Sequence, residues 1–337
     1  MNLRRVLLVA IVVMLSGCAA GRVRAPAPPA SAALIADMEP VARAAEFLAA
    51  RHGRDRVIVV YDIDNTLLAM RTLLGSDQWV TWQEHLPEPP VQGPPRRIYQ
   101  AGKAACLFKV QGLLYLARAM RTTGPSVDTV PRRLRERGFR QWVLTSRSPE
   151  YVAPTLRELQ RQHLRFSSFG IGNAVVPTTP SPAYDSATLE RLFTPDERAK
   201  WKLGQARDVA LVDGVYMTTG QHKGAMLRLL LDRLGIAGRV RGIVFVDDQK
   251  RHVDGMVEAF IGSGIELFAY RYTAEDDAAA SIERPDVQRD VAREWCAFKP
   301  NVAAARSLLD PDVYNLDVSP GAPVEDCLTD ICGPDAR

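Results

Sequence analysis

Five short apolar runs, each followed by polar residues, divide the chain. They cover residues 57–61, 142–144, 209–212, 243–246 and 265–270, and 215–217 comes just after the third. Near-continuous runs of Val, Ile and Leu are typical of strands buried on both faces of a parallel sheet. Helical spacing of apolar residues separates the runs, over 225–234 and from Pro154 towards residue 164. The alternation predicts an α/β domain with a Rossmann-like parallel sheet and helices on both of its faces.

Residues 69 to about 138 interrupt this alternation. The insert contains Trp79, Trp82, a Pro-rich stretch and an apolar, helix-like run over 107–120. We expect a largely helical cap over the strand ends, with the two tryptophans packed in its core because large aromatic side chains bury well. The sequence thus predicts one domain over residues 33–310 that carries the cap insert, followed by a tail over 311–337.

Two pairs of acidic residues follow apolar runs. Asp62 and Asp64 come after residues 57–61, and Asp247 and Asp248 come after residues 243–246. In a parallel sheet the carboxyl ends of the strands lie at one edge, where ligands bind. Carboxylates that converge there suit a hard cation such as Mg²⁺. One carboxylate can attack phosphorus while another moves protons. Capping of helices by these acids is the alternative interpretation.

Hydroxyls and a lysine complete this set of polar groups. Thr145 and Ser146 can hydrogen-bond a phosphoryl oxygen, although such residues also cap helices. Lys223 lies at the start of the helical pattern over 225–234, where the helix N-terminus is already positive. A nearby anion would explain a lysine at this position, so we expect it to bind phosphate. Arg147, which follows Ser146, fits either a substrate contact or a surface ion pair.

These elements, taken in order, resemble the four signature motifs of the haloacid dehalogenase superfamily. Asp62-Ile63-Asp64-Asn65-Thr66 is similar to the first motif, D-x-D-x-T. Thr145 resembles the second motif, Lys223 the third and Asp247-Asp248 the fourth. The chain is also similar to a bacterial subgroup known only as a domain of unknown function. That similarity rests on Tyr-Asp-Ile-Asp-Asn-Thr-Leu-Leu, Leu-Thr-Ser-Arg, His-Lys-Gly and Phe-Val-Asp-Asp.

The resemblance implies a Mg²⁺-dependent phosphohydrolase that acts on a small phosphomonoester. It assigns each motif residue a role: Asp62 as nucleophile, Asp64 as general acid and base, Thr145 and Ser146 as phosphate ligands, Lys223 as the neutralising cation, and Asp62, Asp247, Asp248 and the carbonyl of Asp64 as metal ligands. Two alternatives stay open. The chain could transfer the phosphoryl group to an acceptor other than water, or use the same fold without turnover to bind a protein.

The first residues have the pattern of an export signal. Arg4 and Arg5 precede an apolar run over 6–14, and Leu15-Ser16-Gly17-Cys18 resembles a bacterial lipobox. The resemblance implies removal of residues 1–17, lipidation of Cys18 and anchoring in a lipid bilayer. Ala19 implies an outer-membrane position in the cell envelope, facing the periplasm. The Pro-rich remainder of residues 18–32 predicts a flexible tether. An ordinary cleaved signal with an incidental cysteine is the alternative.

Export would place the other four cysteines in an oxidising compartment, where disulfides form. They are Cys106, Cys296, Cys327 and Cys332. Four cysteines allow three pairings. We favour Cys327–Cys332, because these two are close enough in the sequence to close a small loop.

The charge distribution argues against nucleic-acid binding. The net charge is only +4 over 337 residues, and no basic stripe with interleaved aromatic residues is present. Arginines at 132, 133, 135, 137 and 140 have helical spacing and predict a solvated helix face.

Overall fold

The computed structural model describes residues 33–87, 97–100, 102–166, 178–302, 304, 328–329 and 331–332. The predicted signal over 1–17, Cys18, the tether and nearly all of the predicted tail lie outside these residues. Within these ranges, no helix is both long enough and apolar enough to span a bilayer. The first strand begins at Ala33, where the sequence predicts that the folded part starts.

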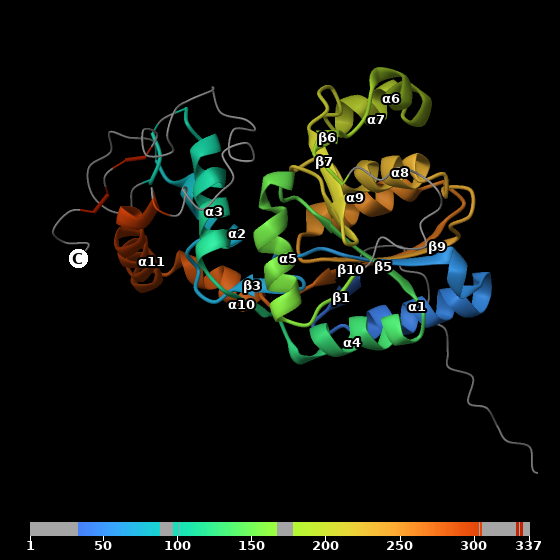
Figure 1. Cartoon of the computed structure of the whole chain (residues 1–337), viewed down its shortest axis with the longest axis horizontal. Coiled ribbons are helices and arrows are strands. Elements are labelled where there is room, and N and C mark those ends of the chain that lie inside the picture. The colour runs from blue at the N-terminus through green and yellow to red at the C-terminus, as the bar shows by residue number, and fades with distance from the viewer. Residues whose placement is uncertain are drawn as a thin grey trace, which may run out of the picture.

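An eight-stranded sheet forms the core (Figure 1). Its order is β1-β10-β9-β2-β5-β8-β7-β6, and the six neighbours from β1 to β8 pair in parallel. The predicted α/β class with a mostly parallel sheet is therefore confirmed. In chain order the strands are β1 (Ala33–Ile35), β2 (Val57–Tyr61), β5 (Arg140–Thr145), β6 (Ser181–Pro182), β7 (Asp208–Val212), β8 (Val215–Met217), β9 (Gly242–Asp247) and β10 (Glu266–Tyr272).

The apolar run over 209–212 forms a strand, as predicted, but this strand is not parallel to its neighbour. It lies in β7, which pairs antiparallel with β8 in a hairpin whose register joins Val212 to Val215. Asp213 and Gly214 form the turn with φ of 47° and 78°. Asp-Gly between two apolar runs favours this type of hairpin turn, because both residues tolerate positive φ. Asp213 is therefore exposed at the amino edge of the sheet, where β8 begins. The carboxyl ends of the parallel strands lie at the opposite edge.

Helices cover both faces of the sheet, as predicted (Figure 1). One face carries α1 (Glu39–His52) and α4 (Pro125–Glu136), and the other carries α8 (Lys223–Arg233) and α9 (Lys250–Phe260). All five residues of β2 are buried. Alternate residues of β2 enter two separate cores, one with α1 and α4 and one with α8 and α9. A strand buried on both faces explains its uninterrupted apolar sequence. Three smaller helices, α5 (Val152–Arg161), α6 (Ser186–Leu192) and α7 (Pro195–Lys200), complete the core.

A largely helical cap follows the first acidic motif, as predicted. It contains β3 (Leu68–Met70), α2 (Asp77–His85), α3 (Ala105–Ala117) and β4 (Met120–Thr122), and β3 pairs antiparallel with β4. Trp79 and Trp82 are buried in α2, which confirms their predicted packing role. The structure places α4, which falls inside the predicted insert, against α1 and β5 on the sheet.

The C-terminal helices join this cap, an arrangement that the sequence did not predict. They are α10 (Asp276–Ala280) and α11 (Pro285–Phe298), and Figure 1 shows α11 beside α3. Arg118 after α3 pairs with Glu294 of α11 at 3.3 Å. We use the word cap below for residues 68–122 together with residues 276–302.

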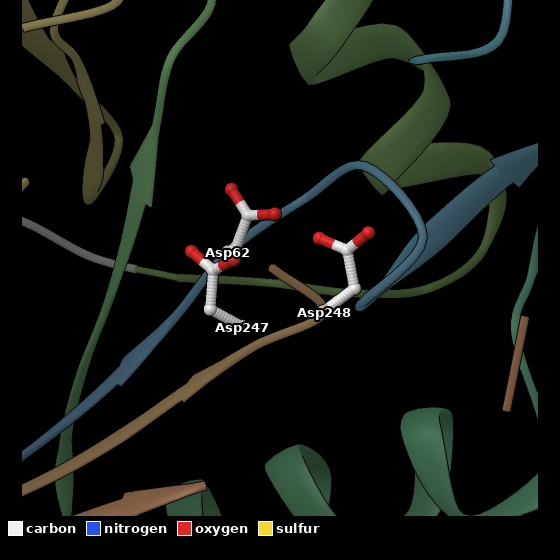
Figure 2. Close-up of side chains that lie close together, drawn as sticks. All are labelled: Asp62, Asp247 and Asp248. Atoms are coloured by element: carbon white, nitrogen blue, oxygen red, sulfur yellow. The ribbon is translucent and has the colours of Figure 1, made fainter. Parts of the chain in front are cut away.

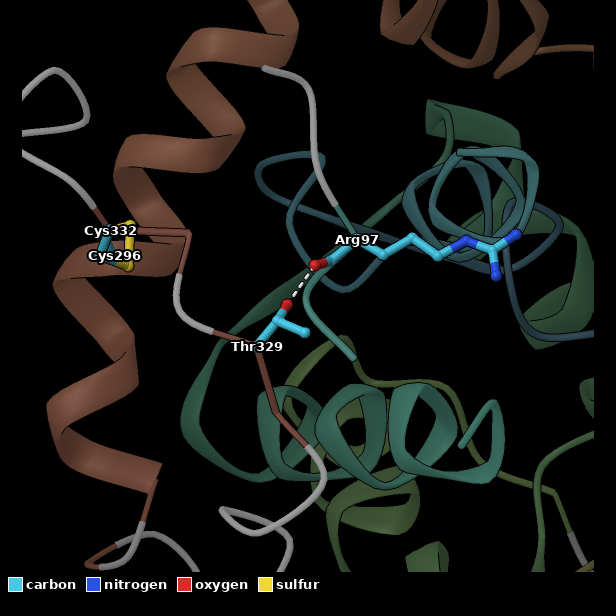
Figure 3. Close-up of a disulfide and its surroundings, with 4 residues drawn as sticks. All are labelled: Arg97, Cys296, Thr329 and Cys332. Carbon is cyan, nitrogen blue, oxygen red and sulfur yellow. Dashed lines mark hydrogen bonds between the residues drawn. A yellow bond between two sulfur atoms is a disulfide. The ribbon is translucent and has the colours of Figure 1, made fainter. Parts of the chain in front are cut away.

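A disulfide attaches the end of the chain to the cap (Figure 3). Cys332 bonds to Cys296 of α11, so the favoured Cys327–Cys332 pairing is wrong. Thr329 hydrogen-bonds through its hydroxyl to the carbonyl oxygen of Arg97, and its N–H donates to the carbonyl oxygen of Ile98 at 2.7 Å. These contacts bring the tail back onto the insert, so closeness in the sequence does not decide the pairing. Cys106 is also disulfide-bonded.

Candidate functional site

Three carboxylates meet at the carboxyl edge of the sheet (Figure 2). Asp62 follows β2, and Asp247 ends β9, the neighbouring strand. Asp248 is the next residue. One oxygen from each of the three lies within 4.8 Å of the others. The parallel pairing of β2 and β9 thus brings together two acidic motifs that are far apart in the sequence.

The turn after Asp62 is held in place by hydrogen bonds to the second motif. Asn65 has a φ of 58°, a left-handed conformation that asparagine tolerates better than most residues. Its side-chain amide donates to Asp248 at 3.3 Å. The Thr66 hydroxyl oxygen accepts from the main-chain N–H of Asp248 at 2.9 Å and lies 3.5 Å from an oxygen of Asp62. The hydrogen bonds of Asn65 and Thr66 to Asp248 therefore hold the loop after β2 against the loop after β9.

Lys223 is the first residue of α8 and reaches the same cluster. Its Nζ donates to Asp62 Oδ1 at 2.5 Å and to Asp247 Oδ2 at 2.6 Å, with 2% of the lysine exposed. The sequence predicts an anion beside this lysine, and two carboxylates of the protein occupy that position. A lysine at a helix N-terminus is tolerated because these two charges compensate both the ammonium group and the helix dipole.

Close packing of α8 on α9 sets the position of Lys223. A Cβ on Gly224 would lie 2.5 Å from Cβ of Ala259, and a Cβ on Gly255 would lie 2.6 Å from Nε2 of His222. Neither helix could approach so closely with larger residues there. His222 Nδ1 accepts from the N–H of Ala225 at 3.1 Å, which caps α8.

Thr145 ends β5, next to β2 in the sheet, and Ser146 is the residue that follows the strand. Thr145 is fully buried, and its hydroxyl oxygen accepts from the main-chain N–H of Arg147 at 3.2 Å. The carbonyl oxygen of Thr145 accepts from the Thr218 hydroxyl at 2.8 Å, and that of Ser146 accepts from the N–H of Gly220 at 2.8 Å. The loop that carries the predicted phosphate ligands is thus fixed against the loop that leads to Lys223.

Arg147 binds Asp64 instead of lying on the surface. Its guanidinium donates to both oxygens of Asp64, at 2.9 and 2.7 Å, and to the Thr155 hydroxyl at 2.9 Å. Only 5% of Arg147 is exposed, and its Cζ lies 3.9 Å from the ring centre of Tyr115 in the cap. Of the two interpretations of Arg147, the surface ion pair is wrong, and the substrate contact stays a prediction. The predicted acid and base, Asp64, directs its carboxylate to an arginine and does not join the three-carboxylate cluster.

The cluster has an excess of negative charge. Burial raises the pKa of Asp62 well above its usual range, and nearby carboxylates add to the effect although Lys223 opposes it. Burial is also the main cause that raises the pKa of Asp248, and the charges of Asp247 and Asp62 raise it further. Burial also disfavours ionised Asp247, but Lys223 and His252 outweigh it and lower the pKa of this group. His252 on α9 lies 3.2 Å from both oxygens of Asp247.

This donor set fits a divalent cation. It consists of hard carboxylate oxygens, which Mg²⁺ prefers. Asp248 Oδ1 is buried without a hydrogen-bond partner among the described residues. A buried acceptor without a donor is costly, and a bound cation would satisfy it.

Comparison with known proteins places the chain in a family. The family model for DUF2608, a protein of unknown function, matches residues 36–304. The chain belongs to the DUF2608 family. No curated protein and no solved structure matches it. The match covers every strand of the sheet except β1, both acidic loops and the cap, so the site described above lies within the family domain.

The cap of this DUF2608 protein adds an acidic residue that the motifs do not include. Asp77 begins α2 and accepts hydrogen bonds from Gln111 at 3.0 Å and from Gln249, next to Asp248, at 3.4 Å. Burial raises the pKa of Asp77 to about 7, and the charge of Asp64 contributes next. In the sequence, Ser76-Asp77 indicates only a helix start. Sequence spacing does not indicate that this helix start lies over the carboxyl edge of the sheet.

Replacing Asp77 by asparagine should stabilise this DUF2608 protein in a pH-dependent way. Because the folded-state pKa of Asp77 exceeds the usual value near 4, wild-type stability falls as pH rises from about 4 to about 7, and asparagine lacks this loss. We expect Asp77→Asn to gain about 1–3 kcal/mol over wild type at pH 8 and almost nothing at pH 4.5. Urea unfolding of both proteins in EDTA measures this difference.

The control for this experiment is Asp128→Asn. Asp128 also lies in the first turn of a helix but is exposed on α4. The control should show no gain in stability with rising pH. An equal advantage of Asp77→Asn at both pH values would show that ionisation of Asp77 does not cost the folded protein stability.

Proposed function

We propose that this DUF2608 protein is a Mg²⁺-dependent phosphohydrolase of the haloacid dehalogenase type that cleaves a small phosphomonoester. The observation that supports this most strongly is the convergence of Asp62, Lys223 and the Asp247-Asp248 pair at the carboxyl edge of the sheet. A carboxylate nucleophile, a fixed cation and free carboxylate oxygens are the groups that phosphoryl transfer requires. Asp64 lies two residues beyond the nucleophile, in the same turn.

Each polar residue of the site has its own role in the proposed reaction. Asp62, Asp247 and Asp248 would hold Mg²⁺, which, when bound, supplies positive charge to the phosphoryl oxygens. Lys223 keeps Asp62 oriented and adds a second positive charge beside it. Thr145 offers its hydroxyl to a phosphoryl oxygen from the neighbouring strand end. His252 holds Asp247 from the side of α9.

The proposed reaction has two displacements at phosphorus. In the first, an oxygen of Asp62 bonds to phosphorus, the ester P–O bond breaks, and Asp64 gives a proton to the leaving oxygen. In the second, Asp64 takes a proton from water as the water oxygen bonds to phosphorus. The bond between phosphorus and Asp62 then breaks, which releases phosphate and restores the Asp62 carboxylate and the protonated form of Asp64.

Arg147 controls when Asp64 can act. Both oxygens of Asp64 accept hydrogen bonds from Arg147, so Asp64 can carry a transferable proton only after this ion pair opens. Tyr115 and Met120 of the cap contact the same guanidinium, at 3.9 Å from the ring centre and 3.3 Å from the sulfur. We infer that an anionic substrate attracts Arg147 away from Asp64. Substrate binding and activation of the acid are thereby linked.

The test is phosphate release by the full chain in neutral detergent. A panel of nucleotides, sugar phosphates and other small phosphomonoesters is incubated with Mg²⁺ or with EDTA. We expect release from at least one compound with Mg²⁺ and none above background with EDTA. Equal release in EDTA would exclude the metal-dependent mechanism. If the protein is folded, binds Mg²⁺ and hydrolyses nothing in the panel, the non-enzymatic binding role becomes the better explanation.

We also propose that lipidated Cys18 tethers this domain to the bacterial cell envelope, at the outer membrane and facing the periplasm. The support is the lipobox-like sequence that ends at Cys18, after an apolar run with a basic start. The mass of the mature N-terminal peptide tests it. An N-terminus other than acylated Cys18 would contradict the proposal.

A further inference from the structure

A pocket lined by arginines and phenylalanines lies at the amino edge of the sheet. Its volume is about 440 Å³, within the range of small-molecule sites. Phe139 and Phe166 contribute an apolar surface, and four arginines and one aspartate provide the charges around it: Arg54, Arg135, Arg140, Arg165 and Asp55. Arg140 begins β5, and Asp55 lies two residues before β2.

This pocket is separate from the proposed catalytic site. Asp62 follows the carboxyl end of β2, whereas Asp55 precedes its amino end. The five residues of β2, which lie between them, span roughly 16 Å. A ligand in the pocket therefore cannot touch the three-carboxylate cluster.

The pocket arginines bond to main-chain carbonyls. Arg54 donates to the carbonyl oxygen of Arg137 at 2.5 Å, and Arg135 donates to that of Arg165 at 3.3 Å. Arg140 donates to the carbonyl oxygen of Asp55 at 3.4 Å. Within the described part of the chain, Arg54, Arg135 and Arg165 form no ion pair with a carboxylate. No carboxylate of the described residues therefore neutralises their charges through an ion pair.

Neighbouring arginines outside the pocket behave differently. Arg133 and Arg137, on and just after the same helix α4, pair with Glu39 and Glu46 of α1. Of the five arginines in the predicted solvated helix face, Arg133 and Arg137 have acidic partners, Arg135 and Arg140 line the pocket, and Arg132 is exposed. Burial lowers the pKa of the Arg140 guanidinium and the nearby Arg239 lowers it further, although Asp55 opposes this shift.

We propose that this pocket binds the phosphate group of an anionic ligand. Guanidinium groups match phosphate oxygens with paired hydrogen bonds, and several around one concave site neutralise a multiply charged anion. The phenylalanines provide room for an apolar portion of the ligand. A soluble phosphate ester and a phospholipid headgroup share this chemistry, and the experiment below separates them.

The experiment is calorimetric titration of the full chain in neutral detergent with EDTA present. The first arm adds inorganic phosphate, and the second adds mixed micelles that contain phosphatidylglycerol or, for comparison, phosphatidylcholine. The test variant is Arg135→Ser with Arg165→Ser, since both side chains are exposed and their loss leaves the core intact. We expect phosphate or phosphatidylglycerol to bind the variant at least about tenfold more weakly than wild type.

A charge-matched control excludes a general effect of net charge. Arg289→Ser with Arg293→Ser removes the same two charges from the exposed surface of α11 and should bind like wild type. Loss of phosphate binding in the pocket variant alone indicates a soluble ligand. Loss confined to phosphatidylglycerol micelles indicates a lipid headgroup. Equal binding by wild type, pocket variant and control in both arms would overturn the proposal, whatever the outcome of the phosphatase assay.

Discussion

The Asp62→Asn variant is expected to lose at least about 10³-fold in phosphate release while it remains folded. An amide nitrogen or oxygen at this position cannot form the acyl phosphate, and no other carboxylate occupies the same place. Lys223 keeps its 2.6 Å contact with Asp247 in the variant, so the helix that carries it stays in position. Steady-state phosphate release with Mg²⁺, on the best substrate of the panel, measures the loss.

The stability of this variant separates a catalytic role from a structural one. Because burial raises the pKa of Asp62 well above its usual range, ionised Asp62 costs the folded protein stability when no cation is bound. The variant should therefore unfold in EDTA at or above the wild-type temperature. It should also gain less stability than wild type from Mg²⁺, since it lacks one ligand.

Asp254→Asn is the matched control for this variant. Asp254 is exposed on α9 and pairs only with Lys250, at 2.6 Å, among the contacts described. We expect full activity from the control. If Asp62→Asn retained activity within about tenfold of wild type, the nucleophile would have to be another group.

The acidic cluster could be predicted because it depends on the parallel direction of the strands and not on particular side-chain contacts. Uninterrupted apolar sequences at 57–61 and 243–246 indicate strands buried on both faces, and such strands belong to parallel sheets. Parallel strands end at one edge, so Asp62 and the Asp247-Asp248 pair are placed together before any contact is known. Lys223 could be added because a lysine at a helix start needs an anion nearby.

Other parts of the site depend on contacts that leave no local trace in the sequence. Asp64 and Arg147 are 83 residues apart, and Asp77 and Gln249 are 172 apart. Asp64 meets Arg147 because β2 and β5 are neighbours in the sheet, and Asp77 meets Gln249 because α2 of the cap lies over the sheet edge. Spacing identified the Asp62 and Asp64 motif but could not show that Asp64 is held by a buried guanidinium.

The arginines at 132–140 show the same limit of prediction from the sequence. Helical spacing treats the arginines from 132 to 140 as one face, although α4 ends at Glu136 and Arg140 begins a strand. Their partners, Glu39 and Glu46, lie on α1, about 90 residues earlier in the chain. Tertiary contacts therefore decide which arginines are neutralised and which are left for a ligand.

The Lys223→Met variant is expected to lose about 3–5 kcal/mol of stability at pH 8 in EDTA. The ammonium group lies between Asp62 and Asp247 at 2.5 and 2.6 Å, and methionine has a similar volume but no charge. Its removal leaves two buried carboxylates facing each other without a cation. Chemical denaturation measures the loss, and activity should fall with it because Lys223 orients the nucleophile.

The loss should depend on pH in a defined direction. Burial opposes ionisation of Asp247, and Lys223 is the largest effect that lowers its pKa, so the pair stabilises wild type above about pH 4. In the variant this pKa rises, and the carboxylates can avoid repulsion by taking up protons. The difference between wild type and variant should therefore shrink as the pH falls from 8 towards 4. A difference that grows in acid would contradict this explanation.

Added Mg²⁺ makes the same variant a test of the metal site. Three carboxylates without a lysine attract a divalent cation more strongly, so Mg²⁺ should raise the unfolding temperature of Lys223→Met by more than that of wild type. Lys250→Met is the control, because Lys250 forms an exposed pair with Asp254 that contributes at most about 1 kcal/mol. If Mg²⁺ stabilised the variant no more than this control, the cluster would not bind the ion, and the proposed hydrolase would need another source of positive charge.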